Sequence, residues 1–165
     1  MEPKAFSIGF RIEHPQGLID RARFGDTTRF PGHPKKIVEH VGAADYKLVY
    51  HAANGRSVYS FCMCPGGTVV AATSEVGRVV TNGMSQYSRL ERNANAGIVV
   101  GIEPSDFGAD AENPLAGIAF QRNLESSAFK LGGESYFAPA QLVGDFLAGR
   151  SSKQLGDVEP SYQPG

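Results

Sequence analysis

The N-terminal segment alternates apolar and polar positions in the way expected of a half-buried strand. The apolar residues lie at every second position: Phe6, Ile8, Phe10 and Ile12. Because side chains alternate between the two faces of a strand, this pattern predicts one apolar face and one polar face. Pro15 ends the pattern, and residues 18–24 then predict a short helix that ends at Gly25.

Short strand-like runs, separated by turn signals, fill the middle of the chain. The runs cover residues 45–52, 56–64, 68–74, 78–83 and 96–104. Asn54-Gly55 lies between the first two runs and tolerates the positive φ angles of a tight hairpin turn. The first four runs predict an antiparallel meander of about four strands. The fifth is apolar throughout, which is typical of a central strand.

The last third of the chain predicts helices. Asn113-Pro114 combines an N-cap residue with proline at the first helical position, and Gly132-Gly133 supplies a helix end. A second helix is predicted from Pro139 to Gly149. Strands followed by helices predict an α+β fold, in which an antiparallel β-meander sheet has the C-terminal helices packed on one face. Residues 26–44 predict a loop with one helical turn.

The length of 165 residues fits one domain. We place a single α+β domain at residues 1–150. Residues 151–165 are rich in proline, glycine and serine and predict a linker-like tail. Because the first strand begins almost at residue 1, we expect the polypeptide to be an interior part of a longer chain.

Charge and hydropathy exclude several classes of partner. Sixteen Lys and Arg against seventeen Asp and Glu give a net charge of −1, so no general attraction to nucleic acid or anionic lipid is expected. The apolar runs are too short to cross a membrane, and residues 1–10 lack the apolar stretch that we would expect of a secretion signal. Two cysteines at close spacing do not form a disulfide framework, so a cytoplasmic location is expected.

Both cysteines lie in one predicted strand, followed by Pro65 and two glycines. Cys62 and Cys64 are two residues apart and are therefore expected to share one face, with Cα atoms about 6.6 Å apart. That separation disfavours a relaxed disulfide. Two thiolates are also only half of a tetrahedral zinc shell, and no histidine lies at ligand-like spacing: His14, His33, His40, His51. We expect no metal site and two small packed thiols, with a redox-active pair as the alternative.

Other chemistry is sparse in this sequence. It contains no G-x-G-x-x-G, phosphate-loop, G-x-S-x-G or H-E-x-x-H motif. Residues 85–97 gather arginines and asparagines that could bind a carboxylate or phosphate, although a solvated loop is the simpler interpretation. Arg11 with Glu13 predicts a cross-strand pair, and Arg122 with Glu125 a pair on a helix surface. No complete catalytic site follows from these residues.

Several longer strings carry more information than any short motif. They include "FSIGFRIEHPQGLID", "YSFCMCPGG", "NGMS" and "NPLAGIAFQRNLESSAF". Together they resemble a family of bacterial FAD-dependent proteins, the NAD(FAD)-utilising dehydrogenases, over nearly all of residues 5–164. In that family the dinucleotide-binding motif lies upstream of this segment, and a stretch that completes the FAD-binding fold lies downstream. The resemblance therefore implies FAD in a longer parent chain, no cofactor in this segment alone, and the parent's FAD-binding domain as partner.

The resemblance also implies positions for candidate site residues. The meander over residues 46–83 would form the wall that faces the flavin ring and covers the substrate. Cys62 and Cys64 are then the catalytic candidates. Pro65, Gly66 and Gly67 are the candidates for contact with the cofactor, and Asn82 or Arg89 for contact with the substrate.

Three hypotheses for function remain at this point. The first is an interior substrate or cap domain of an FAD-dependent oxidoreductase, inactive alone. The second is a stand-alone binding or interaction module without redox chemistry. The third is a thiol-based redox or metal protein that uses Cys62 and Cys64. The substrate, which is expected to be a small molecule, is not specified by the sequence.

Overall fold

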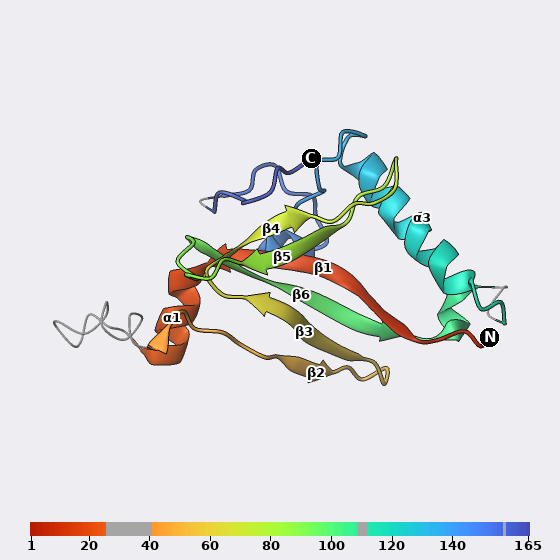
Figure 1. The fold of residues 1–165 in the computed structure, drawn as a ribbon, viewed down its shortest axis with the longest axis horizontal. Helices are drawn as coiled ribbons and strands as arrows, with labels where there is room; N and C mark the ends of the chain where they lie inside the picture. The colour runs from red at the N-terminus through yellow and green to blue at the C-terminus, as the bar shows by residue number, and fades with distance from the viewer. Residues whose placement is uncertain (26–40, 109–111, 157) are drawn as a thin grey trace. The chain divides into compact units, whose positions relative to one another are not determined.

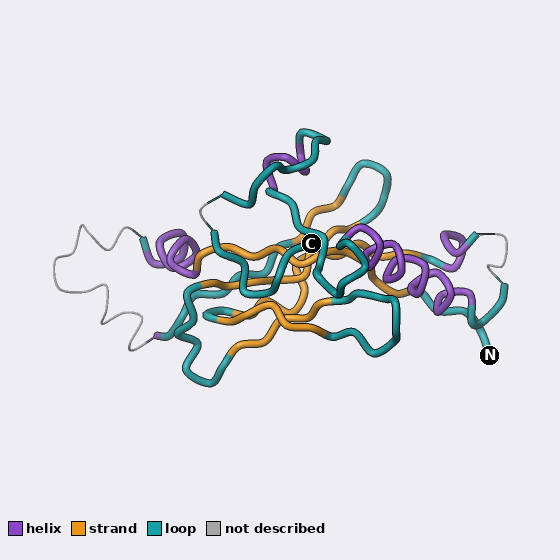
Figure 2. Tube along the Cα trace, turned by 90° about the horizontal axis from the view of Figure 1, so that it is seen from above, coloured by secondary structure: helices purple, strands orange, loops and turns teal. Residues whose placement is uncertain are grey.

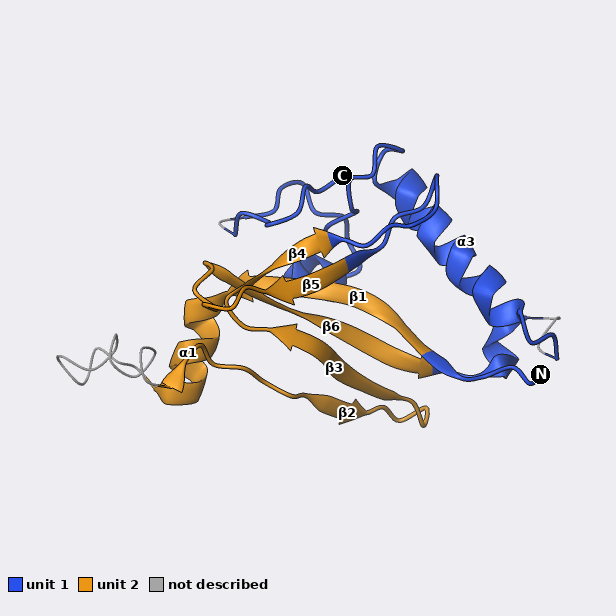
Figure 3. Cartoon of the chain, in the orientation of Figure 1, with its two compact units in different colours: residues 1–6, 71–81, 102–165 blue, residues 7–70, 82–101 orange. Residues whose placement is uncertain are grey.

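The computed structural model describes residues 1–25, 41–108, 112–156 and 158–165, and the statements below concern these residues. Antiparallel strands and a few helices confirm the α+β class (Figure 1). The chain divides into two compact units (Figure 3). The sheet unit comprises residues 7–70 and 82–101, and the helical unit comprises residues 1–6, 71–81 and 102–165.

A four-stranded sheet forms most of the sheet unit, with strand order β1-β6-β3-β2 (Figure 1). Its strands are β1 (Phe6–Pro15), β2 (Val49–His51), β3 (Ser57–Cys64) and β6 (Asn93–Ile102). As predicted, the apolar run that became β6 lies between two neighbours, and its alanines, Ala94 and Ala96, are fully buried. β2 lies at the edge, and all three of its residues are exposed.

The Asn54-Gly55 hairpin between β2 and β3 is confirmed. Gly55 has a φ of +83°, and the Ala52 N–H donates to the Arg56 carbonyl at 2.8 Å. β3 then pairs antiparallel with β6, with Val58 opposite Val100. These pairings put residues that are distant in sequence side by side, and the site described below depends on them.

The next two strands do not continue this sheet. β4 (Gly67–Ala71) and β5 (Thr81–Ser85) form a separate two-stranded sheet, so the predicted run of four strands is divided between two sheets. The cause lies at the end of β3, where the register with β6 shifts between Phe61 and Cys64. A bulge of this kind bends the strand and interrupts its pairing.

Helix α1 (Gln16–Phe24) follows β1 directly and begins two residues earlier than predicted. It ends at Gly25, as predicted, with φ +85° and an N–H bonded to the Arg21 carbonyl. The buried side chain of Gln16 ties this helix to the rest of the sheet unit. Its Nε2 donates to the Ala44 carbonyl at 2.9 Å, and its Oε1 accepts from the Gly66 N–H at 2.7 Å.

The helical unit contains the 3-10 turn η2 (Pro104–Phe107), α3 (Ala116–Leu131) and the short α4 (Val143–Leu147), drawn in purple in Figure 2. α3 begins two residues after the predicted proline. Asn113 makes a turn in front of it, with its Oδ1 accepting from the Leu115 N–H at 2.9 Å. The predicted end at Gly132 is confirmed. α4 begins at Val143 and not at Pro139, because Leu142 is still extended.

Aromatic side chains pack the helical unit. The ring centroids of Phe6 and Phe107 are 5.5 Å apart, and those of Phe107 and Phe120 are 6.0 Å apart. Gly117 allows this packing, because a Cβ at that position would lie 3.0 Å from the Phe6 ring.

An ion pair in the helical unit corrects one sequence prediction. Arg122 pairs with Glu75 at 3.1 Å, and not with Glu125. Glu125 instead accepts a hydrogen bond from the Gln121 side chain, and its carbonyl accepts one from the Val79 N–H at 3.0 Å. The Arg122–Glu75 ion pair and the hydrogen bond from Val79 to the Glu125 carbonyl both join residues 71–81 to α3. Helical spacing alone does not reveal these contacts.

The last residues make backbone contacts with the segment that follows α3. The Ala138 N–H donates to the Gln163 carbonyl at 3.2 Å, and the Gly165 N–H donates to the Ala138 carbonyl at 2.8 Å. The proposed linker-like nature of residues 151–165 stays a prediction. No helix in the described ranges is both long enough and apolar enough to cross a membrane.

Candidate functional site

A group of polar side chains gathers around Arg11 in the sheet unit. Arg11 Nη1 donates to Asn95 Oδ1 at 2.6 Å and to the Cys62 carbonyl at 3.3 Å. Arg11 Nη2 donates to Asn82 Oδ1 at 3.1 Å. We call Arg11, Asn82, Asn95 and the Cys62 carbonyl the arginine cluster. It joins four strands: β1, β3, β5 and β6.

Strand pairing explains how these residues meet. Arg11 lies on the polar face of β1, and the start of β6 runs beside the end of β1, since the Gln16 N–H donates to the Arg92 carbonyl at 2.9 Å. Asn95 is therefore carried next to Arg11. The bulge in β3 brings the Cys62 carbonyl to the same place.

Gly83 makes room for the cluster. A Cβ at this position would overlap both Asn95 Oδ1 and Arg11 Nη1. The Gly83 N–H also donates to Asn82 Oδ1 at 2.8 Å, so this oxygen accepts from both the backbone and Arg11. At Gly83 a larger residue would therefore displace the Arg11 and Asn95 side chains from their present positions.

The charge of Arg11 is not neutralised in the described part of the chain. The guanidinium is half-buried, and all three of its hydrogen-bond acceptors there are uncharged oxygens. Asn95 is fully buried, and its Nδ2 has no hydrogen-bond partner among the described residues. A buried donor without an acceptor is uncommon in folded proteins and calls for an explanation.

The two cysteines differ from the sequence prediction in one respect. Both are free thiols, but Cys62 is exposed and Cys64 is buried, so they do not share one environment. The reason is the β3 bulge: Cys62 has φ +47°, which breaks the two-residue alternation of a regular strand. The Cys64 thiol donates to the Cys62 carbonyl at 3.3 Å.

Electrostatics keep the Cys64 thiol protonated. Burial raises its pKa, because the thiolate would lose contact with water, and the neighbouring Cys62 raises it further. Arg11 acts in the opposite direction but does not outweigh burial. A nucleophilic or metal-binding role needs the thiolate, so this environment is unfavourable for both. The described residues hold no group of three or more potential metal ligands, and His33 and His40 lie outside the described residues.

Pro65, Gly66 and Gly67 are all buried. Gly66 has φ +46°, and a Cβ there would overlap the Arg89 carbonyl, while one at Gly67 would overlap the Met84 carbonyl. The Gly66 N–H is already bonded to Gln16. The two glycines therefore allow a close approach to other backbone of the same chain, at Arg89 and Met84. Contact of these residues with a cofactor stays a prediction.

Of the two substrate candidates, one belongs to the arginine cluster. Asn82 is bonded to Arg11, as described above. Arg89 is exposed, sits in a turn with φ +52°, and makes no side-chain hydrogen bond or ion pair with the described residues. The structure thus joins Asn82 to Arg11, which the sequence suggested only as a member of a cross-strand pair with Glu13.

The sequence interpretation of residues 85–97 as a solvated loop is wrong for its last part. Asn93 and Asn95 belong to β6 and are 3% and 0% exposed. The predicted pairing of Arg11 with Glu13 is replaced by contacts with these asparagines, since Asn93 Nδ2 donates to Glu13 Oε1 at 2.9 Å. The Asn-Ala-Asn-Ala alternation was the signal for this strand, because it places both amides on one face.

His14 lies next along β1 and is also partly buried. Its Nε2 lies 2.9 Å from the Tyr46 hydroxyl, whereas its Nδ1 has no partner among the described residues. Burial lowers the pKa of His14, because the charged imidazolium is poorly solvated there. His14 is therefore held in its neutral form and adds no positive charge beside Arg11.

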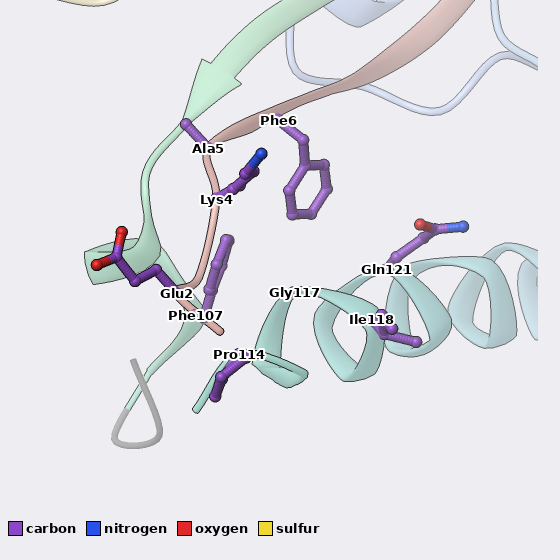
Figure 4. Close-up of a pocket in the computed structure, with 9 residues that line it drawn as sticks. All are labelled: Glu2, Lys4, Ala5, Phe6, Phe107, Pro114, Gly117, Ile118 and Gln121. Atoms are coloured by element: carbon purple, nitrogen blue, oxygen red, sulfur yellow. The ribbon is translucent and has the colours of Figure 1, made fainter. Parts of the chain in front are cut away.

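A separate hollow of about 320 Å³ lies in the helical unit (Figure 4). Its lining comes from the N-terminal segment, η2 and the start of α3: Glu2, Lys4, Ala5, Phe6, Phe107, Pro114, Gly117, Ile118 and Gln121. Phe6 and Phe107 supply its apolar surface. None of the candidate residues lies in it, and it brings together no nucleophile and base.

Comparison with known proteins identifies the family. Residues 5–165 match the family described as FAD-dependent protein, C-terminal domain-like. The chain belongs to this family. It is also 54% identical, over 166 aligned residues, to an uncharacterized protein of Clostridium beijerinckii. The alignment covers 100% of this chain but 29% of that relative, so the chain spans less than a third of the relative's length.

Proposed function

We propose that this chain is the substrate or cap domain of a longer FAD-dependent oxidoreductase, in which it forms part of the wall over the flavin and is inactive alone. The observation that carries this proposal is the family match over residues 5–165. The short span within the Clostridium relative supports a larger parent protein. The remainder of such a parent would contain the FAD-binding domain.

The described residues fit one side of a flavin site. The sequence has no dinucleotide-binding glycine motif of its own. The arginine cluster offers hydrogen-bond donors and positive charge, which suit a ligand with electron-rich acceptor atoms. FAD would supply the hydride or electron transfer. The residues of this chain would orient the reactants, exclude water and adjust the local charge.

Exposed apolar side chains support docking against further protein. On and beside the edge of the four-stranded sheet, Leu48, Val49, Tyr50 and Phe61 are between 58% and 67% exposed. Because neighbouring positions of a strand face opposite sides, these side chains expose apolar surface on both faces of the sheet edge. Exposed apolar surface at a sheet edge favours an interaction site. We propose that the rest of the parent chain covers them. The two free thiols are compatible with the cytoplasmic location that we also propose.

The second candidate is a binding module without redox chemistry. The observation in its favour is that the arginine cluster is assembled entirely from residues of the sheet unit. Such a module could hold an acidic small molecule without any flavin. A thiol-based enzyme has less support, because burial raises the pKa of Cys64.

A flavin titration separates these candidates. FAD would be added to this 165-residue chain and to the flavin-stripped full-length Clostridium relative, with flavin fluorescence and absorbance as readouts. We expect tight saturable binding by the full-length protein and much weaker binding by the chain, which must be shown to be folded by near-ultraviolet circular dichroism. Failure of the full-length protein to bind FAD would overturn the oxidoreductase proposal. FAD binding by the chain alone with the affinity of the full-length protein would overturn a shared site.

A further inference from the structure

We propose that the arginine cluster is a binding site for a planar anion with two adjacent acceptor atoms, the chemistry of a small carboxylate. Arg11 and Asn82 would donate hydrogen bonds to this ligand, and Asn95 would hold Arg11 in position. The site stands on the geometry of the sheet unit, and only its flavin variant, given below, rests on the proposed function.

A surplus of donors is the first argument. A guanidinium has five N–H groups, and three of those of Arg11 donate to oxygens of the described chain. Nε–H and one Nη2–H have no acceptor there. The exposed Asn82 uses its Oδ1 twice, which leaves its Nδ2 for another acceptor. The unpartnered Nδ2 of the buried Asn95 adds to the imbalance. What the cluster lacks is acceptors.

The missing counter-charge is the second argument. Other arginines of the described chain that form ion pairs do so with carboxylates: Arg78 and Arg122 with Glu75, and Arg150 with Asp145. Arg11 is half-buried yet bonds only neutral oxygens there. A partly desolvated cation is costly unless an anion compensates it. An incoming carboxylate would provide both the charge and the acceptors, and the two remaining N–H groups suit its two oxygens.

The site is also held in place before any ligand arrives. Asn95 is immobilised inside β6, and its Oδ1 is 2.6 Å from Arg11 Nη1. The Cys62 carbonyl and Gly83 limit the guanidinium from two further directions. Fixing a long side chain in advance reduces the entropy that binding must overcome.

Two sources could provide this ligand chemistry. One is the carboxylate of a small substrate. The other is the edge of a flavin ring that carries a ring nitrogen beside a carbonyl oxygen and becomes negatively charged on reduction. Both present two neighbouring acceptors to a guanidinium, so the test needs one probe for each.

The experiment follows the Nε–H signal of Arg11 by nitrogen-15 NMR in the 165-residue chain. The probes are sodium benzoate and riboflavin, with sodium chloride at equal ionic strength as control. Arg11→Gln removes the guanidinium. Asn95→Asp keeps the shape of the side chain but places a carboxylate against Arg11. This carboxylate would form an ion pair with the guanidinium and so compete with the ligand. Arg23→Gln is the matched control, because it removes an exposed arginine of α1 that belongs neither to the cluster nor to the candidate substrate contacts.

We expect a saturable shift of the Arg11 signal with at least one probe. The affinity should fall at least tenfold in Asn95→Asp and in Arg11→Gln, and should be unchanged in Arg23→Gln. In Arg11→Gln, where the Arg11 signal is lost, the backbone N–H signal of Gly83 is followed instead. If Arg11→Gln fails to fold, Asn95→Asp decides, because it retains the guanidinium. Benzoate binding identifies the substrate source, and riboflavin binding alone identifies the flavin edge.

Three results would overturn the proposal: no saturable shift with either probe, an equal loss in Arg23→Gln, or unchanged binding in Asn95→Asp. Benzoate binding that depends on Arg11, together with a full-length relative that binds no FAD, would refute the proposed oxidoreductase and leave the anion site standing.

Discussion

Two neighbouring contacts between β1 and β6 are built from the same residue type and end in opposite electrostatic states. At one, Asn93 donates its amide N–H to the Glu13 carboxylate at 2.9 Å. At the other, two residues along both strands, Asn95 accepts from Arg11 at 2.6 Å, and its own N–H₂ group has no partner among the described residues. Both asparagines are buried.

The difference shows how a neutral amide treats charges of either sign. An asparagine can offer its donor to an anion or its acceptor to a cation, but it neutralises neither. Beside Glu13 the amide presents a donor to an anion, so this contact stabilises the strand pair. Beside Arg11 the oxygen of the Asn95 amide accepts from one guanidinium N–H, and the amide Nδ2 has no partner among the described residues. The Arg11 end therefore retains a capacity to bind an acceptor.

The largest expected effect comes from changing the Glu13 end. Asn93→Asp would replace the donor to Glu13 by a second carboxylate, which the 3.4 Å contact from Arg92 Nε to Asn93 Oδ1 would compensate only in part. We expect a loss of about 2–3 kcal/mol in the free energy of unfolding at pH 7. Urea denaturation measures it.

Asn95→Asp is the matched comparison, since the same change two residues along faces a guanidinium. Its cost in the same denaturation experiment should be clearly smaller. Equal losses at both positions would show that the two ends do not differ electrostatically.

A second, intermediate effect is expected from Gly83→Ala at the Arg11 end. The added methyl group would overlap Arg11 and Asn95, and we expect a loss of about 1–3 kcal/mol with a displaced Arg11 Nε–H signal. Gly101→Ala is the control, because a Cβ at that position meets no atom within 4 Å. Unfolding curves and NMR spectra of both variants make the comparison. If Gly83→Ala behaves like Gly101→Ala, the guanidinium is not confined as described.

The smallest expected effect concerns the cysteines beside Arg11. Iodoacetamide should modify the exposed Cys62 at least about ten times faster than the buried Cys64 at pH 8, because alkylation requires an accessible thiolate. Arg11→Gln should slow Cys64 further, since the charge of Arg11 opposes the raised pKa of this thiol. Peptide mass spectrometry over time measures both rates. Faster alkylation of Cys64 in Arg11→Gln would contradict the assigned influence of Arg11.

Local signals in the sequence predicted much of the fold. The strand from Phe6, the hairpin at Asn54-Gly55 and the helix ends at Gly25 and Gly132 each depend on a few adjacent residues, and all are confirmed. Helix starts were less accurate, because a turn precedes α3 and the extended Leu142 precedes α4. The division of the strands between two sheets was missed, since it depends on a bulge that no local pattern announced.

The candidate site was predicted only in part. Asn82 was named, but Arg11 was interpreted as a partner of Glu13 and Asn95 as part of a loop. The contact between Arg11 and Asn95 joins residues 84 positions apart. It exists only once β1 and β6 pair, so composition and spacing along the chain could not show it. The absence of a counter-charge likewise becomes visible only when the neighbours of Arg11 are known.

The Asn82-Gly83 step also has a consequence for the chemical ageing of the protein. Asparagine followed by glycine is the dipeptide most prone to spontaneous deamidation, in which the glycine nitrogen attacks the asparagine side chain. Here the Gly83 nitrogen is 2.8 Å from Asn82 Oδ1. The product is a carboxylate in hydrogen-bond reach of Arg11, so slow deamidation during storage would neutralise the cluster from within. The attack requires β5 to open, so the rate of deamidation at Asn82 would measure how often β5 unfolds locally.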